Sequence, residues 1–118
     1  MSISDYHAAV IALALATLLA QTPSPAPIAP QPDVAELFEK RCSLCHGADG
    51  RGKTKKGREY KTPNFTSARY QKHTRDDEIR DAIANGVRKT KMKGFKDKLT
   101  PEQRETLFLY VRAFGKKS

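Results

Sequence analysis

Several features of common protein classes are missing from this 118-residue chain. Its only two cysteines both lie within residues 42–46, so neither is left for a structural disulfide elsewhere. No clear alternation of β-branched residues predicts a strand, which argues against a βαβ fold. The glycine-rich segment 47–52 follows no strand and has no Gly-Lys-Ser/Thr ending, which excludes a phosphate-binding loop. The longest apolar run, residues 8–20, is shorter than the roughly 20 residues that cross a bilayer.

Residues 1–32 differ in composition from the rest of the chain. No Lys, Arg, Asp or Glu occurs from position 7 to position 32. The apolar run predicts a secretory signal peptide at residues 1–20, or an anchor if it is not cleaved. The segment before the run carries Asp5 and lacks the usual positive charge, and a buried N-terminal helix is the alternative. Residues 21–32 hold five prolines, which predicts an extended linker and leaves one small domain at 33–118.

Residues 42–46 read Cys-Ser-Leu-Cys-His, which is the attachment pattern for a c-type haem. Two thiols one helical turn apart can form thioethers with the two vinyl groups on one edge of the porphyrin. The adjacent histidine can donate a ring nitrogen to the iron as the proximal ligand. The pattern predicts one covalent haem c per chain, attached at Cys42 and Cys45 with His46 on the iron.

Three other interpretations of this string account for less of it. A thioredoxin-like dithiol needs a βαβ context around the two cysteines. A structural zinc site needs four ligands, and the only other histidines are His7 and His73. A simple disulfide between Cys42 and Cys45 leaves His46 unexplained.

Capping residues and apolar periodicity predict three helices. The first follows Asp33 and covers residues 34–41. The second begins near Thr74 or Asp76 and ends at Asn85, before Gly86. The third begins after Thr100 with a capping box and ends at 115–117. Their predicted buried faces are Val34, Leu37 and Phe38; Ile79, Ala82, Ile83 and Val87; and Leu107, Tyr110, Val111 and Phe114. Residues 53–73 look irregular.

The motif after a short helix, a single methionine in a late loop and an aromatic-rich last helix resemble a class I c-type cytochrome over residues 33–116. The resemblance implies an all-α, small cytochrome c-like domain of three to four helices around one haem. It implies that Met92 is the distal ligand and that the first and last helices cross. It also implies that the Pro63 carbonyl accepts a hydrogen bond from His46. Lys93 stands where the family often has proline, which predicts a looser hold on Met92.

Met92 also stands out on its own, because it is the only methionine apart from Met1. Its neighbours are mostly lysines and arginines, so it is not in core sequence, and binding to iron explains a thioether there. His73 is the rival distal ligand, and its ordinary role is that of a solvated residue before a helix. Tyr60, Pro63 and Phe65 either cover the core under a loop or pack against the haem and its propionates.

These residues predict an exported, periplasmic, monomeric one-electron carrier, soluble or membrane-tethered, rather than an enzyme; no acid–base pair is seen. The alternatives are a ligand-binding sensor or peroxidase-like enzyme with a labile Met92, and a tethered subunit of a larger electron-transfer complex. The net charge of +9 includes basic clusters at 53–61 and 88–98. They predict acidic redox partners, and membrane proximity if the N-terminus is retained. Nucleic acid is not expected, because no recognition motif accompanies the charge.

Overall fold

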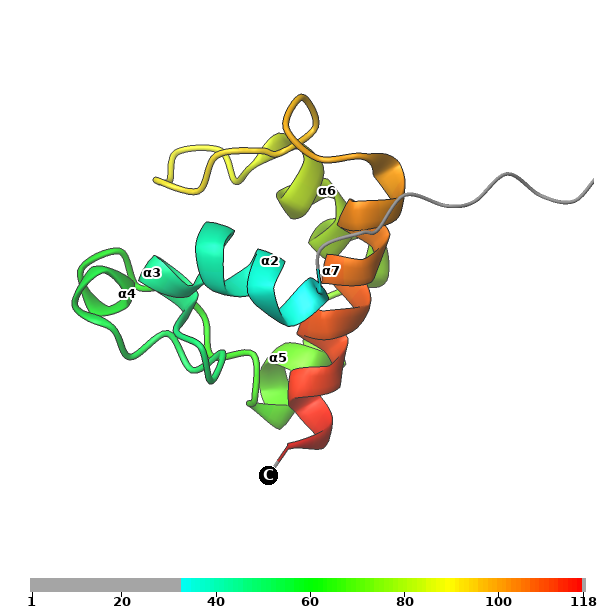
Figure 1. Cartoon of the computed structure of the whole chain (residues 1–118). Helices are drawn as coiled ribbons and strands as arrows, with labels where there is room; N and C mark the ends of the chain where they lie inside the picture. The colour runs from blue at the N-terminus through cyan, green and yellow to red at the C-terminus, as the bar shows by residue number, and fades with distance from the viewer. Residues whose placement is uncertain (1–32, 118) are drawn as a thin grey trace, which may run out of the picture. The chain divides into compact units, whose positions relative to one another are not determined.

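The structure, a computed structural model, describes residues 33–117, and the helices within that range form a small all-α domain (Figure 1). They are α2 (Val34–Arg41), α3 (Ser43–His46), α4 (Lys55–Glu59), α5 (Ala68–His73), α6 (Asp76–Asn85) and α7 (Pro101–Ala113), followed by a 3₁₀ turn at Phe114–Lys116. None of these helices is long and apolar enough to cross a membrane. The signal peptide and linker predicted for residues 1–32 lie outside the described residues.

The three predicted helices are present, although α6 begins without a side-chain cap and α7 ends at Ala113, where a 3₁₀ turn replaces the helix expected up to 115–117. Asp33 accepts a hydrogen bond from the Ala35 N–H at the start of α2. Thr100 and Gln103 form both bonds of a capping box at the start of α7. Gly86 ends α6 with φ of 78°, a left-handed conformation that glycine adopts without strain.

The prediction for residues 53–73 is wrong, because this segment contains α4 and α5. These helices have five and six residues, too few to show an apolar periodicity in the sequence. Their N-caps are Thr54 and Ser67, whose hydroxyls accept from the Gly57 and Tyr70 N–H groups. With α3, they bring the number of α-helices in the described part of the chain to six, more than the three to four expected.

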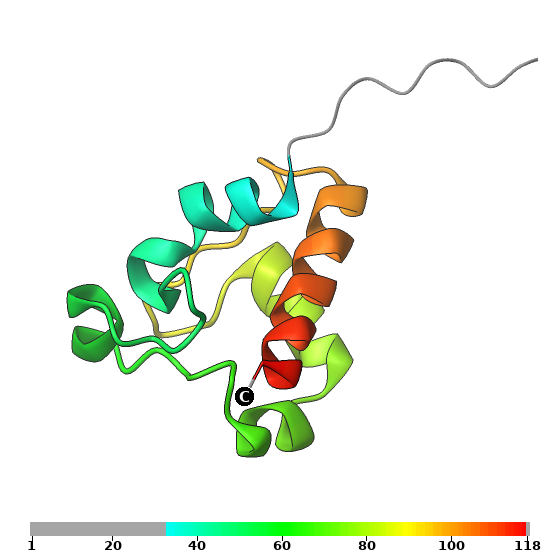
Figure 2. The same ribbon diagram turned by 60° about the horizontal axis from the view of Figure 1, so that its bottom comes forward.

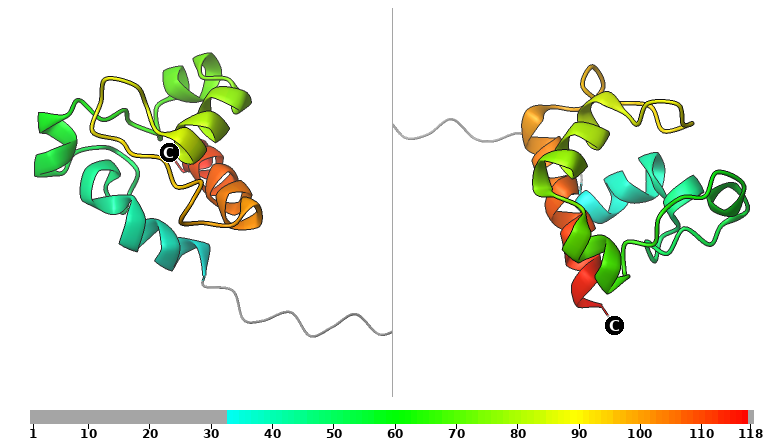
Figure 3. Two further views of the ribbon diagram at one scale, coloured as in Figure 1. Left: turned by 90° about the horizontal axis from the view of Figure 1, so that it is seen from above. Right: turned by 180° about the vertical axis from the view of Figure 1, so that it is seen from behind.

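Helices α2 and α7 cross, as the resemblance implied (Figure 2). Aromatic side chains pack together where they meet. The Phe38 ring lies 5.1 Å from the Tyr110 ring and 5.3 Å from the Phe114 ring, between centroids. Helix α6 runs beside α7, as the right-hand view of Figure 3 shows. Helix α7 therefore packs against both α2 and α6.

The core contains most of the predicted helix faces, but Val34, Ala82 and Tyr110 are only half-buried, Val87 is exposed and Phe108 is added. The buried hydrophobic residues are Leu37, Phe38, Phe65, Ile79, Ile83, Leu99, Leu107, Phe108, Val111 and Phe114. Phe108 was not predicted; it is buried because α7 has neighbours on two sides. Val87 was predicted to be buried but is 41% exposed, because the chain leaves the helix direction at Gly86.

Candidate haem site

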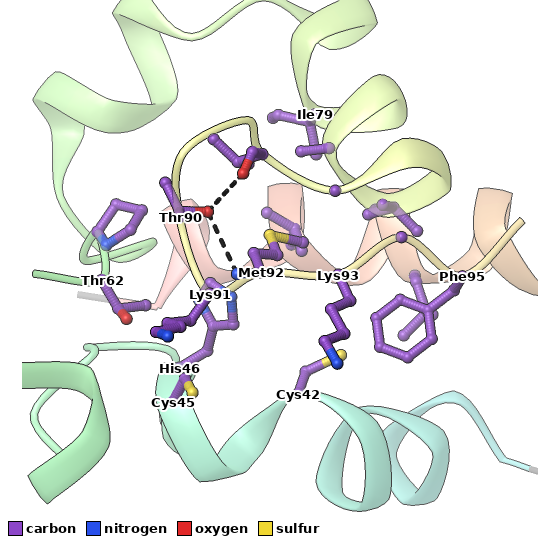
Figure 4. A pocket seen from close by; sticks show the side chains of 18 of the residues that line it. Cys42, Cys45, His46, Thr62, Ile79, Thr90, Lys91, Met92, Lys93 and Phe95 are labelled. Atoms are coloured by element: carbon purple, nitrogen blue, oxygen red, sulfur yellow. Dashed lines mark hydrogen bonds between the residues drawn. The ribbon is translucent and has the colours of Figure 1, made fainter. Parts of the chain in front are cut away.

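A cavity of about 700 Å³ lies between the motif helix α3 and the loop that follows α6 (Figure 4). The motif residues line one side of it, and Met92 comes from the loop on the opposite side. Core side chains also reach it: Ile79, Ile83, Leu107 and Val111. Every site residue predicted from the sequence lines this cavity, namely Cys42, Cys45, His46, Tyr60, Pro63, Phe65 and Met92. The rival ligand His73 does not line it and is exposed at the end of α5.

The two cysteines stand one turn apart, because α2 continues into α3 through Cys42. The Cys42 N–H donates to the Phe38 carbonyl at 2.8 Å, and the His46 N–H donates to the Cys42 carbonyl at 2.9 Å. Both thiols are free, so the alternative disulfide is not formed. Burial raises the pKa of Cys42 to about 11, although neighbouring Arg41 acts in the opposite direction. Cys42 is therefore a protonated thiol at neutral pH.

The N-cap and the middle of helix α4 contact the backbone of the motif helix α3. The Thr54 hydroxyl donates to the carbonyl oxygens of Leu44 at 2.7 Å and Cys45 at 3.2 Å. Gly57 packs so closely that a Cβ atom there would collide with the carbonyl oxygens of Cys45 and Gly52. Neither Thr54 nor Gly57 is predicted as a site residue from the sequence, where the only signal is the N-cap pattern at Thr54.

The His46 ring is held by stacking and not by a hydrogen bond. It lies 4.5 Å from the Phe65 ring between centroids, at an interplanar angle of 18°. Its Nδ1 atom is buried without a hydrogen-bond partner, so the expected bond to the Pro63 carbonyl is not formed. Burial lowers the pKa of His46 to about 4, which keeps the imidazole neutral at pH 7. A neutral imidazole has the lone pair that a metal ligand needs.

The loop that carries Met92 is fastened at several points. The Thr90 hydroxyl donates to the Val87 carbonyl at 2.7 Å and accepts from the Met92 N–H at 3.2 Å (Figure 4). The Val87 N–H donates to the Met92 carbonyl at 3.1 Å, and Gly86 forms an isolated antiparallel bridge with Lys93. The backbone at Met92 is thus held at the end of α6 by hydrogen bonds. This is so although Lys93 stands where class I c-type cytochromes often have proline.

The residues fit a covalently attached haem. Two free thiols one turn apart, a neutral histidine with a buried unpartnered nitrogen and an apolar cavity behind them are the chemistry that this group requires. Within residues 33–117, no three His, Cys, Asp or Glu side chains are grouped as a metal site, which leaves the zinc alternative without support.

Comparison with known proteins identifies relatives of the same kind. Residues 29–111 match the family model described as cytochrome c oxidase, cbb3-type, subunit III. The chain is similar to the solved structure of the KustC0563 c-type cytochrome, with 36% sequence identity, a TM-score of 0.64 and coverage of 70% of this chain and 96% of that one. A tyrosine-to-phenylalanine mutant of the same protein matches with 38% identity, a TM-score of 0.63 and coverage of 70% and 98%. Among curated proteins, no sequence matches the chain.

Proposed function

The chain belongs to the cytochrome c family of the cbb3-type oxidase subunit III, and we propose that it is an exported one-electron carrier with His46 and Met92 as axial ligands. It carries one covalent haem c at its single motif, Cys42, Cys45 and His46. Members of the family are typically electron carriers rather than enzymes. One observation carries the proposal: the cavity has the haem-attachment motif on one side and Met92 on the other.

The chain's own residues divide the work of holding the cofactor. Cys42 and Cys45 would hold the haem covalently as thioethers, and the neutral His46 ring would donate a nitrogen lone pair to the iron. When bound, the haem supplies a couple between Fe(III) and Fe(II), which moves one electron at a time. Ile79, Ile83 and Leu107 exclude water from the cavity side that faces the core.

Two observations support Met92 as the distal ligand. Its backbone is fixed on the cavity wall by Thr90 and Val87, so little backbone entropy remains to be lost on ligation. The rival His73 is exposed and outside the cavity lining. A thioether opposite a histidine raises the reduction potential of haem iron, which suits an electron carrier.

We further propose that acidic redox partners dock at the mouth of the cavity. The two basic clusters, residues 53–61 and 88–98, are far apart in sequence but both contribute to the cavity lining, through Lys61 and through Lys91 and Lys93. Lys91 and Lys93 project from the loop toward the side that holds the cysteines (Figure 4). Such a concentration of positive charge attracts an acidic surface and speeds encounter at low salt.

This docking proposal is tested with an anionic oxidant, ferricyanide, in place of the partner. We expect the stopped-flow oxidation rate to fall steeply with ionic strength, and to fall at low salt in the Lys61→Gln and Lys91→Gln variants, which remove two lysines that line the cavity. Lys72→Gln is the matched control, because Lys72 is exposed on α5 and does not line the cavity. Equal effects of all three substitutions would mean that net charge alone, and not this surface, controls the rate.

Export to the periplasm is part of the proposal, because c-type cytochromes are exported proteins. The predicted signal peptide at residues 1–20 supports it. If that segment stays uncleaved, residues 21–32 become a tether, and the second candidate function is that of a tethered subunit of a larger electron-transfer complex. The family description as an oxidase subunit favours this second candidate over a free carrier. The N-terminal sequence of the mature protein separates the two candidates.

The ligation is tested by optical spectra of the exported, haem-loaded full chain beside the Met92→Ala variant. We expect a c-type reduced spectrum and, in the oxidised protein, a far-red sulfur-to-iron band that vanishes in the variant. Leu109→Ala is the matched control, since it truncates an exposed apolar side chain that does not line the cavity and should keep the band. Covalent haem without the band, or a band that survives Met92→Ala, would remove Met92 from the iron.

A further inference from the structure

We propose that Phe65 is the positioning residue that sets the plane of the His46 ring. Phe65 was expected to pack against the haem or to cover the core; its closest aromatic contact is instead the proximal histidine itself. The inference rests on the proposed axial role of His46 and is independent of Met92.

The two rings are nearly parallel. Their centroids are 4.5 Å apart and their planes differ by 18°. Phe65 also approaches Tyr70, at 5.1 Å and 48°, and Phe114, at 6.1 Å and 29°. Of these three contacts, the one with His46 is the shortest and the most nearly parallel, which is the arrangement in which one flat ring best limits rotation of another.

His46 lacks the usual device for orienting a ligand histidine. A histidine on a metal commonly donates its other ring N–H to a carbonyl or carboxylate, which fixes the plane of the ring. Here the Nδ1 atom is buried without any hydrogen-bond partner. Stacking on Phe65 is therefore the contact that opposes rotation of the imidazole about its Cβ–Cγ bond.

Phe65 can act as a reference plane because its own backbone is fixed at both ends. Its N–H donates to the Gly50 carbonyl at 2.8 Å, and its carbonyl accepts from the Gln71 side-chain amide at 2.7 Å. The same amide donates to the Val111 carbonyl on α7 at 3.0 Å. The Phe65 side chain is 5% exposed, so it has little room to adopt another rotamer.

The consequence is spectroscopic as well as structural. The plane of an axial imidazole sets how its π orbitals overlap with those of the iron, and electron paramagnetic resonance of the ferric protein reports this orientation through the g values. A ring held in one plane gives one narrow set of g values, and a ring free to rotate gives a shifted or broadened set.

The test compares haem-loaded Phe65→Leu with wild type by this resonance. We expect Phe65→Leu, which keeps apolar volume but removes the flat ring, to shift or split the g values. Phe65→Tyr keeps the ring and should restore the wild-type signal. Phe108→Leu is the matched control: Phe108 is buried in the same core, but it does not line the cavity and makes no ring contact with Phe65 or His46, so the g values should not move.

Unchanged g values in Phe65→Leu would overturn the inference, as would an equal shift in Phe108→Leu. A wild-type signal without histidine ligation would instead contradict the proposed function, because His46 would not bind the iron. The failure of the proposed function can thus be told apart from the failure of the Phe65 proposal. If Phe65→Leu does not load haem, proton resonance spectra of the reduced wild type decide. Cross-peaks between the ring protons of Phe65 and His46 are expected, and their absence would overturn the proposal.

Discussion

Replacing Arg112 by alanine should destabilise the fold, because this side chain links α7 to the end of α5 and the start of α6. Its guanidinium donates to the backbone carbonyls of Gln71 at 3.0 Å and Thr74 at 2.7 Å, at the end of α5. It also donates to the Gln71 side-chain oxygen at 3.1 Å and to an Asp76 carboxylate oxygen at 2.6 and 2.9 Å. One side chain on α7 thus satisfies the last carbonyls of α5 and the first acid of α6.

The magnitude follows from which of these bonds are shielded from water. The Arg112 side chain is 22% exposed, while Asp76 is 59% exposed, so the ion pair itself contributes under about 1 kcal/mol. A hydrogen bond from a charged donor contributes roughly 1.5–3 kcal/mol, and the lower end applies to these part-buried carbonyls. We expect Arg112→Ala to lower the free energy of unfolding by about 3 kcal/mol. For a domain of this size that corresponds to a fall in Tm of roughly 12–24 °C.

Arg80→Ala is the matched control. Arg80 makes a two-pronged pair with Glu105, at 2.9 and 3.0 Å, and lies 4.0 Å from the centre of the Phe108 ring. Both partners are nearly half exposed and no backbone carbonyl depends on them, so the loss should be much smaller. Urea unfolding of the haem-loaded variants, followed by circular dichroism, measures both. If Arg112→Ala costs no more than Arg80→Ala, burial of the carbonyl bonds is not what stabilises this corner.

Three further outcomes follow from single contacts. Thr90→Val removes two hydrogen bonds of about 0.5 kcal/mol each beside Met92, so the ferric protein should bind added imidazole roughly fivefold more tightly. Thr90→Ser keeps the hydroxyl and should bind imidazole as wild type does. Equal imidazole affinities of the two variants would show that the Thr90 hydroxyl does not help to hold Met92. Gly57→Ala should lower the free energy of unfolding in urea by about 1–3 kcal/mol through its collision with the Cys45 carbonyl, and Arg58→Ala in the same helix should be neutral. The hydrogen bond from Arg80 holds the pKa of Glu105 below its usual 4.5. The small stabilisation by this pair is therefore present above that pH and is lost as the Glu105 carboxylate is protonated at lower pH. A titration followed by carbon magnetic resonance should show that the Glu105 pKa rises in Arg80→Ala.

The sequence was sufficient for the elements with strong local signals. Helices α2, α6 and α7 each have a capping residue or an acidic first turn, together with an apolar stripe that extends over two or more turns. Helices α4 and α5 have caps but no stripe, so nothing in the periodicity separated them from loop. Phe108 was missed because its burial depends on a second neighbour of α7, which is a property of the packed fold.

The candidate site divides in the same way. The spacing of Cys42, Cys45 and His46 identifies the attachment motif by chemistry alone, and the isolation of Met92 among charged residues marks its loop. Contacts between distant segments were not predictable. The bond from Thr54 to the Leu44 carbonyl spans ten residues, and the stacking of Phe65 on His46 depends on how the segment after α4 folds back. The family's proline contact pointed to Pro63, two positions from the residue that touches the histidine ring.

These contacts connect the motif to α7 by two separate routes. The first follows the chain, because α3 continues from α2 and Phe38 of α2 packs on Tyr110 and Phe114. The second passes through side chains, from His46 to Phe65 by stacking, from the Phe65 carbonyl to Gln71, and from Gln71 to Arg112. The first route fixes where the His46 backbone stands, and the second constrains the plane of its ring. Arg112→Ala should therefore also broaden the ferric resonance signal, whereas Arg80→Ala, which lies outside this route, should leave that signal unchanged.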